Sequence, residues 1–471
     1  MNTSRDIPNP RDASAFRFLD CDYHPETGVA SLSYAFDNGP ELVEQITFPH
    51  APWPPEASRQ ACFRRALEIL WLVAGVSYYK AGLSPRMELS KPVPAEGLDI
   101  FLTGLYVEGL AEFGYVNQVD VAARVRFPVS EAEPEAQLET EPGAGRMPVA
   151  RPLILPERAL VAMGGGKDSL VGLDLLKRAE IPVLPICVGG AALIRETVQA
   201  AGLPLLAIDR RLAPELSLMN QAGALNGHVP VTAINSAILL CASILYGCRY
   251  IVFANERSAD EATRKTLEGR EINHQYSKSS AFERAFREVI ARQVSPDIEY
   301  FSILRPYSEL AIVQRFAGMR EFHSVYSSCN RNFHIDGPRI TGRWCLDCPK
   351  CRFAALSLAV FMKPDEVAGI QGGDLLNDEK QEAGFRALCE LGHEKPFECV
   401  GEAGESRAAL ASLGARDEWR QHAVVRALLP ELESLVVPSL KDLLRPSQQH
   451  FIPPSIQKAV LVHEGGAGSL D

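Results

Sequence analysis

Polar and apolar side chains alternate between residues 15 and 50, which is the pattern of strands with one buried face. The cluster HPETG at residues 24–28 supplies a turn between two such runs. Further along, apolar side chains recur at the three- and four-residue spacing of helices. We therefore expect an α+β domain over residues 15–128, preceded by a flexible N-terminus over 1–14. Its expected elements are an antiparallel sheet over 15–50, helices over 57–82 and 98–115, and a strand over 119–127.

A stretch rich in Glu, Pro, Ala and Gly follows at residues 129–150, with almost no large apolar side chains. It buries too little surface to offset its ordering entropy, which predicts an acidic linker. Beyond it, short apolar runs alternate with helical patterns, as in a parallel sheet covered by helices on both faces. The expected fold class is therefore α/β, a doubly wound parallel sheet joined to the N-terminal α+β domain. The further expected segments are a nucleotide-binding domain over 151–325, a four-cysteine segment over 326–363, a helical C-terminal region over 364–450 and a tail over 451–471.

The first apolar run of this second part, residues 159–163, leads directly into three glycines, GGGKDS, and then into a helical pattern. Glycine has no Cβ atom, so the backbone bends tightly and an anion can approach its N–H groups. A helix that starts at Asp168 or Ser169, and is capped by one of them, aims unpaired N–H groups and a partial positive charge at the same point. We interpret the turn as a phosphate-binding site, distinct from the GxxxxGK[ST] and GxGxxG loops. The residues assigned to it are Gly164, Gly165, Gly166, Lys167, Asp168 and Ser169.

Ligands of open parallel sheets lie at the carboxyl ends of the strands. Gly189 and Asp209 occupy such positions and are assigned to nucleotide binding. Glu256 and Arg257 follow the expected strand 250–254. Arg257 can hold a phosphate or carboxylate with two hydrogen bonds, and Glu256 can hold Mg²⁺ or accept a proton. Asp168 is the other expected Mg²⁺ contact.

Three further candidates for the chemistry lie between elements. His228 stands in GHVPVTAINS, just before an expected helix over 232–246, where it is either an anion contact or a turn residue. Lys265 and His274 lie in a long polar connection, which is either a lid over the phosphates or a solvated loop.

Four cysteines, Cys329, Cys345, Cys348 and Cys351, follow the spacing C-x15-C-x2-C-x2-C. Four thiolates in two short turns suit tetrahedral Zn²⁺ and fill its coordination shell, so such a site is structural. An iron–sulfur cluster and unrelated cysteines are the alternatives.

The composition limits the classes of partner. A net charge of −11 and a pI near 5.5 argue against a broad nucleic-acid surface. The N-terminal residues lack an apolar signal segment, and the most apolar runs are too short to span a bilayer. Eleven cysteines without a framework spacing fit reduced thiols. We expect a cytoplasmic protein that acts on small molecules, without nucleic-acid or membrane partners.

GGGKDS resembles the PP-loop, G-G-x-D-S, of the N-type ATP pyrophosphatases in the adenine nucleotide alpha hydrolase-like (HUP-like) superfamily. Longer phrases resemble the UDP-N-acetyl-α-D-muramoyl-L-alanyl-L-glutamate epimerase (MurL) family. They are SYAFDNGPELVEQITFP, AGVSYYKAG, GLAEFGYVNQ, AMGGGKDSL, GHVPVTAINS, FANERSAD and WCLDCPKCRFA.

The resemblance implies a PP-loop ATPase fold and an ATP- and Mg²⁺-dependent inversion of the terminal L-Glu of UDP-MurNAc-L-Ala-L-Glu to D-Glu. ATP would be converted to AMP and pyrophosphate, in peptidoglycan precursor synthesis. The competing interpretations are a 7-cyano-7-deazaguanine synthase-like or tRNA-modifying PP-loop enzyme, and a nucleotide sensor without turnover. The sequence does not identify the base; His228, His274, Lys265, Tyr276 and Glu256 are all admissible. It also leaves open the oligomeric state and the domain that binds the UDP-muramyl group, for which position alone favours the N-terminal one.

Overall fold

The computed structural model describes residues 9–91, 97–128, 150–190, 192–261, 264–265, 271–332, 340, 342–392, 395–396, 398 and 400–462. The chain divides into two compact units. The first comprises Met1–Arg158, Ala207–Ile251 and Arg264–Tyr300, and the second comprises Ala159–Leu206, Val252–Thr263 and Phe301–Asp471. Within the described ranges, no helix has the length and apolar character needed to cross a bilayer.

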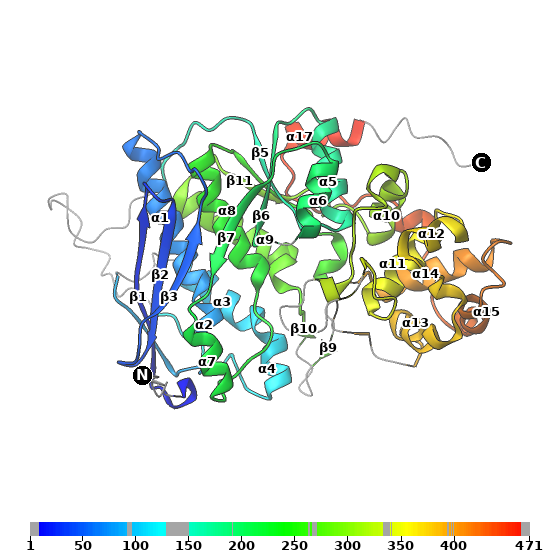
Figure 1. The fold of residues 1–471 in the computed structure, drawn as a ribbon, viewed down its shortest axis with the longest axis horizontal. Helices are drawn as coiled ribbons and strands as arrows, with labels where there is room; N and C mark the ends of the chain where they lie inside the picture. The colour runs from blue at the N-terminus through cyan, green and yellow to red at the C-terminus, as the bar shows by residue number, and fades with distance from the viewer. Residues whose placement is uncertain are drawn as a thin grey trace. The chain divides into compact units, whose positions relative to one another are not determined.

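The first unit contains the expected antiparallel N-terminal sheet (Figure 1). Its strands lie in the order β7-β3-β2-β1-β4. Gly28, with φ +69°, closes the turn between β1 and β2, where a Cβ atom would collide with the Phe48 carbonyl oxygen. The strands are β1 (Ala15–His24), β2 (Val29–Phe36), β3 (Leu42–Thr47), β4 (Arg86–Leu89) and β7 (Leu206–Arg211).

Helices of the first unit pack on this sheet and on each other. The long helices α1 and α8 lie side by side (Figure 1), and the Arg59 guanidinium of α1 donates to the Ile244 carbonyl of α8. Trp71 is buried and donates its indole N–H to the Ser33 carbonyl at 3.1 Å, which fixes α1 on β2. The helices are α1 (Ala57–Ala74), α2 (Val76–Tyr79), α3 (Leu98–Gly109), α4 (Ala111–Asn117), α7 (Glu215–Gln221), α8 (Val231–Tyr246) and α9 (Ser280–Val289), followed by a π-helix (Ile290–Val294); β9 (Arg264–Lys265) and β10 (Glu271–Ile272) form a separate hairpin.

The strand expected over residues 119–127 is wrong. The segment forms a turn, in which the Asp120 carboxylate accepts the Ala123 N–H and the Val125 N–H bonds to the Val121 carbonyl. Its apolar side chains still point into the core, which explains the misleading alternation. β4 instead pairs in parallel with β1. The expected helix over 57–82 breaks at Gly75, where Phe18 and Tyr106 leave no room for a side chain. The expected linker, 129–150, lies outside the described residues except for its last residue.

The second unit is built on parallel strands. β5 pairs with β6 in parallel, from Ala159 opposite Val183 to Ala162 opposite Ile186. The order is β11-β8-β5-β6, and the chain passes from one unit to the other within β8 and β11. The Ile303 N–H donates to the Phe253 carbonyl, so β8 and β11 end beside each other. The strands are β5 (Ala159–Ala162), β6 (Val183–Val188), β8 (Tyr250–Phe253) and β11 (Glu299–Ser302).

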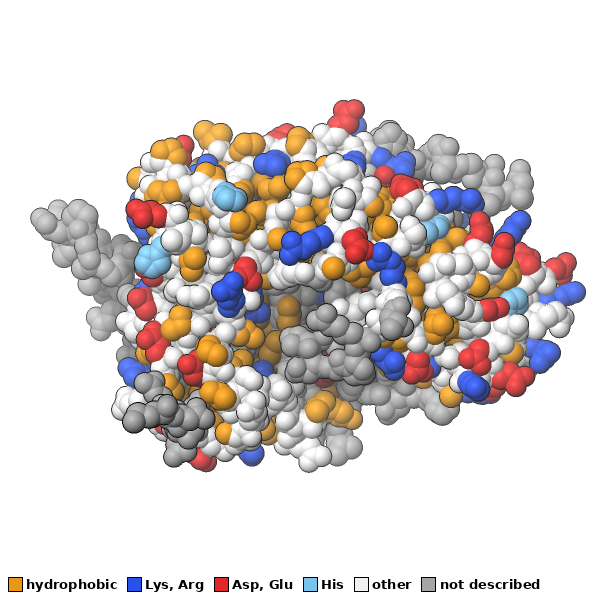
Figure 2. All heavy atoms as spheres, viewed as in Figure 1, with side chains coloured by type: hydrophobic (Ala, Val, Ile, Leu, Met, Phe, Trp, Pro, Cys, Tyr) orange, Lys and Arg blue, Asp and Glu red, His pale blue; other side chains and the backbone are white. Residues whose placement is uncertain are grey.

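Helices cover these strands and continue into a helical C-terminal region, as expected. In α5, Gly172 lies where a Cβ atom would come within 2.9 Å of Ile303, so its absence allows the helix close to the strands. Helices α11, α13 and α14 pack together (Figure 1). On the face drawn in Figure 2, acidic and basic side chains are interspersed over the C-terminal helices. The helices are α5 (Lys167–Arg178), α6 (Ala192–Ala200), α10 (Glu309–Ala317), α11 (Pro349–Ala359), α12 (Pro364–Gln371), α13 (Glu382–Cys389), α14 (Ala403–Gly414), α15 (Ala423–Leu428), α16 (Leu440–Leu443) and α17 (Pro454–Val462).

Candidate functional site

The glycine loop, residues 164–166, joins β5 to α5 as the sequence predicts. Gly165 has φ +75°, a conformation that favours glycine, and a Cβ atom there would lie 3.2 Å from Ile194. Gly164 faces open space, since nothing lies within 4 Å of a Cβ built on it. Helix α5 begins at Lys167, and its N-cap is Gly166.

The expected side-chain cap of this helix is wrong. No side chain caps α5; the Asp168 carboxylate turns to Lys167, and the Ser169 hydroxyl donates back to the Gly166 carbonyl at 3.1 Å. The first N–H groups of a helix have no partner inside it, and here the N-cap residue, Gly166, has no side chain to bond them. They are therefore available to an anion at the positive end of the helix.

Lys167 is held between two carboxylates. Its Nζ lies 2.6 Å from Asp168 Oδ1 and 2.5 Å from Glu309 Oε2, and both Lys167 and Glu309 are buried. Burial alone would lower the pKa of Lys167, but the charges of Asp168 and Glu309 outweigh it, so the pKa lies above its ordinary value. Burial raises the pKa of Glu309, and the carboxylates of Asp168 and Glu256 raise it further. The Lys167 ammonium thus pairs with two carboxylates, and a third acidic side chain, Glu256, acts on Glu309.

The carboxyl ends of β8 and β11 are joined beside this cluster. The Arg257 N–H donates to the Tyr307 carbonyl at 3.0 Å, and Arg305 Nη1 donates to the Glu256 carbonyl at 2.8 Å. Glu256 is buried. The structure therefore brings together Asp168, Lys167 and Glu256 from the predicted residues, with Arg257 next to Glu256.

Glu309 was missed by sequence reasoning. It stands in the first turn of α10, just after the N-cap Ser308, at the end of the connection from β11. The signal was available, because this is a third strand-to-helix connection at the same end of the parallel strands.

The C-terminal helices also reach this region. Glu405 of α14 accepts the Leu310 N–H at the start of α10, with 3.2 Å between nitrogen and Oε1. Burial, and then the nearby Glu402 carboxylate, raise the pKa of Glu405 to about 7, while Arg257 acts in the opposite direction. Lys395 forms an ion pair with Glu261. The segment beyond residue 363 therefore contributes charged groups close to Arg257 and α10.

Other predicted residues belong to the first unit. His228 Nδ1 lies 3.5 Å from Glu112 Oε2. The His228 side chain is 35% exposed, and its partial burial, and then the charges of His274 and Lys278, lower the pKa of His228 to about 4. His228 is therefore uncharged at neutral pH, and His274 is a buried neighbour within electrostatic reach.

The remaining predicted residues are placed as follows. Asp209 was expected at the carboxyl end of a strand, and this is wrong: it is exposed within β7, which continues to Arg211, and it pairs with Arg211 at 2.7 Å. Lys265 pairs with Glu271 through the backbone of β9 and β10. Gly189 follows β6 with φ +88°. The predicted residues thus divide into a second-unit group, with the glycine loop and Gly189, and a first-unit group of Asp209, His228, Lys265 and His274.

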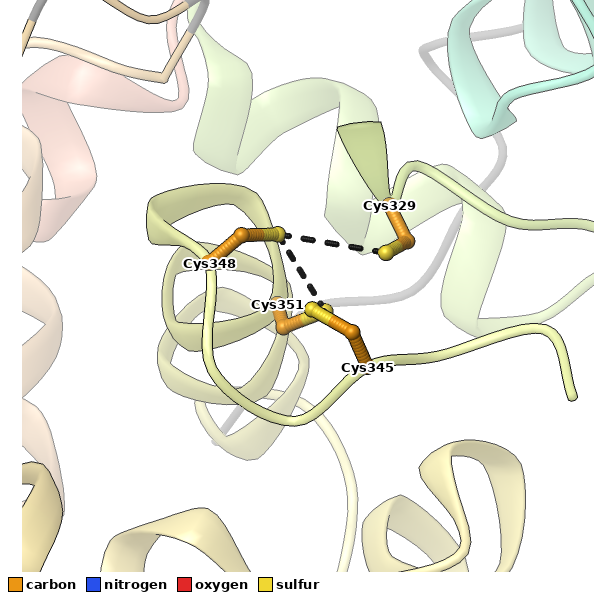
Figure 3. Close-up of side chains that lie close together, drawn as sticks. All are labelled: Cys329, Cys345, Cys348 and Cys351. Atoms are coloured by element: carbon orange, nitrogen blue, oxygen red, sulfur yellow. Dashed lines mark hydrogen bonds between the residues drawn. The ribbon is translucent and has the colours of Figure 1, made fainter. Parts of the chain in front are cut away.

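The four predicted cysteines converge in the second unit. Cys348 caps α11, Cys351 lies in its first turn, and Figure 3 shows Cys329 and Cys345 approaching from loops with all four sulfurs directed to one centre. The four Sγ atoms lie within 4.8 Å of one another, and three of the sulfur–sulfur distances are 3.5, 3.7 and 4.0 Å. A tetrahedron with metal–sulfur bonds of about 2.3 Å has sulfur–sulfur edges of about 3.8 Å. The donor set therefore fits a tetrahedral metal ion.

Ser327 connects this cysteine cluster to the glycine loop. Its N–H donates to the Gly165 carbonyl at 3.5 Å, and its hydroxyl accepts the Cys329 N–H at 3.0 Å. The neighbouring Tyr326 is fully buried against Phe316 and Trp344. Its hydroxyl finds no hydrogen-bond partner among the described residues and interacts electrostatically with Lys167. The cysteine cluster thus fixes one side of the loop.

Two family models match the chain, one described as the MurL N-terminal domain over residues 8–303 and one as the MurL C-terminal domain over residues 325–442. Three curated relatives carry the name UDP-N-acetyl-alpha-D-muramoyl-L-alanyl-L-glutamate epimerase. The relative from Xanthomonas oryzae pv. oryzae is 44% identical over 422 residues, 89% of this chain and 90% of the relative. Those from Salinispora tropica and a Micromonospora species are 40% and 41% identical over 430 and 429 residues, 90% of this chain and 90% and 92% of the relatives. No solved structure matches the chain.

Proposed function

Because the chain belongs to the MurL family, we propose that it is an epimerase that converts the terminal L-Glu of UDP-N-acetyl-α-D-muramoyl-L-alanyl-L-glutamate to D-Glu. The observation that carries this proposal is the 40–44% identity to relatives of that name along about nine-tenths of the chain. Such breadth favours the epimerase over a 7-cyano-7-deazaguanine synthase-like enzyme, a tRNA-modifying enzyme or a nucleotide sensor. Those alternatives rest on resemblance in the glycine loop and cysteines.

We infer that ATP activates the glutamate carboxyl group as an adenylate and releases pyrophosphate. A carboxylate makes its own α-proton hard to remove, because the product would be a dianion. Adenylation removes that charge, and each unit of acidity gained at the α-carbon lowers the barrier by up to about 1.4 kcal/mol. A base then takes the proton, an acid returns one to the opposite face, and water releases AMP.

The glycine loop supports the proposed role in ATP binding and a PP-loop, HUP-like assignment of the second unit. Unpaired N–H groups at the start of α5 suit the developing charge of pyrophosphate. The open space at Gly164 leaves room for an anion against the backbone. Lys167 adds a fixed positive charge beside the loop.

The acidic side chains around Lys167 suit Mg²⁺. Mg²⁺ prefers carboxylate oxygens, and Asp168 and Glu256 are the residues that would hold it. Burial is the main cause of the raised pKa of Glu309, and the carboxylates of Asp168 and Glu256 add to it, so an additional cation would relieve the repulsion among these side chains. Bound Mg²⁺ would neutralise charge on the phosphates.

The proton-transfer groups remain those named from the sequence. His228 has an uncharged imidazole at neutral pH, which is the state a base requires. His274, Lys265, Tyr276 and Glu256 are the other candidates for the base or the opposite-face acid.

We propose that the cysteine cluster holds structural Zn²⁺, which would complete the fold between Ser327 and α11. Four thiolates leave no open coordination position, so the ion would take no part in the chemistry. Its effect on the reaction would pass through Ser327 and the Gly165 carbonyl.

One assay tests the epimerase proposal. The protein is incubated with the UDP-muramyl dipeptide, ATP and Mg²⁺ in heavy water, and AMP and deuterium at the glutamate α-carbon are measured. We expect both signals, and Asp168→Ala should abolish AMP formation without unfolding the protein. Folded protein that gives neither AMP nor deuterium contradicts the proposal, and deuterium uptake without ATP contradicts the adenylation step alone.

A further inference from the structure

Lys80 is a buried cation of the first unit without an acidic partner. The residue is 5% exposed, and no carboxylate of the described residues forms an ion pair with it. Its Nζ donates to Asn226 Oδ1 at 2.8 Å, a neutral acceptor. Burial lowers the pKa of Lys80 to about 8, so the ammonium form still dominates at neutral pH. An ammonium buried in this way normally has a counter-charge.

Three other cations of the described residues that have little exposed surface do have one. Lys167 lies against Asp168 and Glu309, Lys395 against Glu261, and Arg210 against Glu44 at 2.7 Å. Lys80 differs from them in having only an amide oxygen. The absence of a counter-charge therefore distinguishes Lys80 from these three cations.

The loop above Lys80 is fixed from several sides. Asn226 Oδ1 also accepts the Gly227 N–H at 2.9 Å, and its carbonyl accepts Asn117 Nδ2 at 3.1 Å. The Leu225 N–H donates to the Ala81 carbonyl, next to Lys80, at 3.0 Å. Asn226, unlike Lys80, is exposed to solvent. The Lys80 ammonium is thus bonded to a loop that hydrogen bonds hold in place and whose Asn226 faces solvent.

The same loop carries His228. Its imidazole lies 3.5 Å from Glu112 and within electrostatic reach of His274 and Lys278, whose charges lower its pKa. Lys80 is therefore bonded to the loop that also carries His228, one of the candidate bases. Lys80 lies in AGVSYYKAG, one of the phrases that resemble the MurL family.

We propose that Lys80, with Asn226, forms an anion subsite of the first unit that binds an acidic group of the nucleotide-sugar substrate. The identity of the ligand rests on the proposed function. The shared chemistry is an anionic oxygen, supplied either by the diphosphate of UDP or by a carboxylate of the L-Ala-L-Glu peptide. A charge-assisted hydrogen bond to such an oxygen supplies the counter-charge that Lys80 lacks.

Calorimetric binding tests the subsite without requiring turnover. Wild type, Lys80→Met and Lys80→Gln are titrated with the UDP-muramyl dipeptide, with UDP and with L-Ala-L-Glu, and each melting temperature is recorded. We expect both variants to bind the complete substrate at least tenfold more weakly and to melt no lower than wild type, because a buried charge has been removed. Loss of UDP binding as well identifies the diphosphate; retained UDP binding identifies the peptide carboxylate.

Lys91→Met is the matched control in the same unit, because Lys91 pairs with Asp20 at 2.9 Å. It should leave substrate affinity unchanged. Unaltered affinity in both Lys80 variants overturns the subsite, and so do variants that lose melting temperature but keep affinity. Wild type that binds neither UDP nor the substrate overturns it together with the ligand assignment. Wild type that binds the substrate through Lys80 but forms no AMP contradicts the proposed reaction and leaves the subsite standing.

Discussion

Lys167 Nζ and Glu309 Oε2 lie 2.5 Å apart although 142 residues separate them in the sequence. The contact joins the helix that follows β5 to the helix that follows β11, and both side chains are less than a tenth exposed. A buried ion pair is strongly destabilised when one partner is lost, because the other charge remains without compensation. The pair therefore links the stability of the second unit to the position of the glycine loop.

A double-mutant cycle tests this link. We expect Lys167→Met to lower the free energy of unfolding by about 3–5 kcal/mol, since it leaves Asp168 and Glu309 facing each other. Adding Glu309→Gln should recover part of that loss, with a coupling of about 0.5–3 kcal/mol in urea denaturation. The exposed pair Arg320–Glu366 is the control and should give a coupling below about 1 kcal/mol. Equal couplings for the two pairs would contradict the buried ion pair.

The glycine loop offers two alanine substitutions with different expected results. Gly165→Ala forces a side chain into a conformation that costs about 1–2 kcal/mol and crowds Ile194, so it should lower the melting temperature. Gly164→Ala meets no neighbouring atom and should leave the melting temperature unchanged.

AMP formation gives the second readout of this pair. If phosphate occupies the open space at Gly164, the added methyl group should reduce AMP formation at least tenfold in a protein of normal stability. Full activity of Gly164→Ala would exclude phosphate from that space.

The stability of the protein should depend on pH through Glu405. Its pKa is raised by burial and by Glu402 to about 7, above the ordinary value of 4.5. The folded protein therefore keeps this proton where the unfolded chain has lost it. The contribution of protonated Glu405 to the free energy of unfolding is complete below about pH 4.5 and is lost as the pH rises through about 7.

Urea denaturation between about pH 5 and 7.5 measures this contribution. The free energy of unfolding should fall with rising pH in wild type and fall less steeply in Glu405→Gln, whatever the absolute stability of that variant. Glu379→Gln, at an exposed position, should retain the wild-type slope. Identical slopes in all three proteins would show that Glu405 does not titrate in this range.

Metal content should depend on the cysteine cluster. We expect about one zinc ion per chain, absent from Cys348→Ala and retained in Cys187→Ala, whose buried thiol lies outside the cluster. Elemental analysis of purified protein measures this. Because Ser327 connects the cluster to Gly165, loss of the metal should also weaken ATP binding, measured by calorimetry. Iron in place of zinc would favour the alternative cluster.

Local sequence patterns predicted which segments form strands and helices better than they predicted which of these segments contact each other. The alternating pattern at residues 15–50 and the turn at Gly28 correctly indicated the antiparallel sheet. In a strand with one buried face, apolar and polar side chains alternate along the sequence, so the pattern is local. The segment 119–127 shows the same alternation but is tied into a turn by Asp120. A hydrogen bond accepted by one side chain thus accompanies a turn that the periodicity alone did not reveal.

The candidate site was predictable only in part. GGGKDS and the cysteine spacing are continuous signals, and the loop, α5 and the four sulfurs were correctly foreseen. The sequence did not single out Glu309, Glu405 or Lys80. Each of them matters because of a partner far away in the sequence, respectively Lys167, the Leu310 N–H and Asn226. Such a relation has no local pattern.

The order in which the second unit's parts are synthesised follows from its sequence. At about 5–20 residues per second, Lys167 leaves the ribosome roughly 7–30 s before Glu309, which lies 142 residues later. For that interval the nascent chain carries β5 and β6 without β11 or α10, and the lysine stays in water. A fragment that stops near residue 303, where the first family model ends, would contain β11 but would permanently lack α10 and the carboxylate of Glu309.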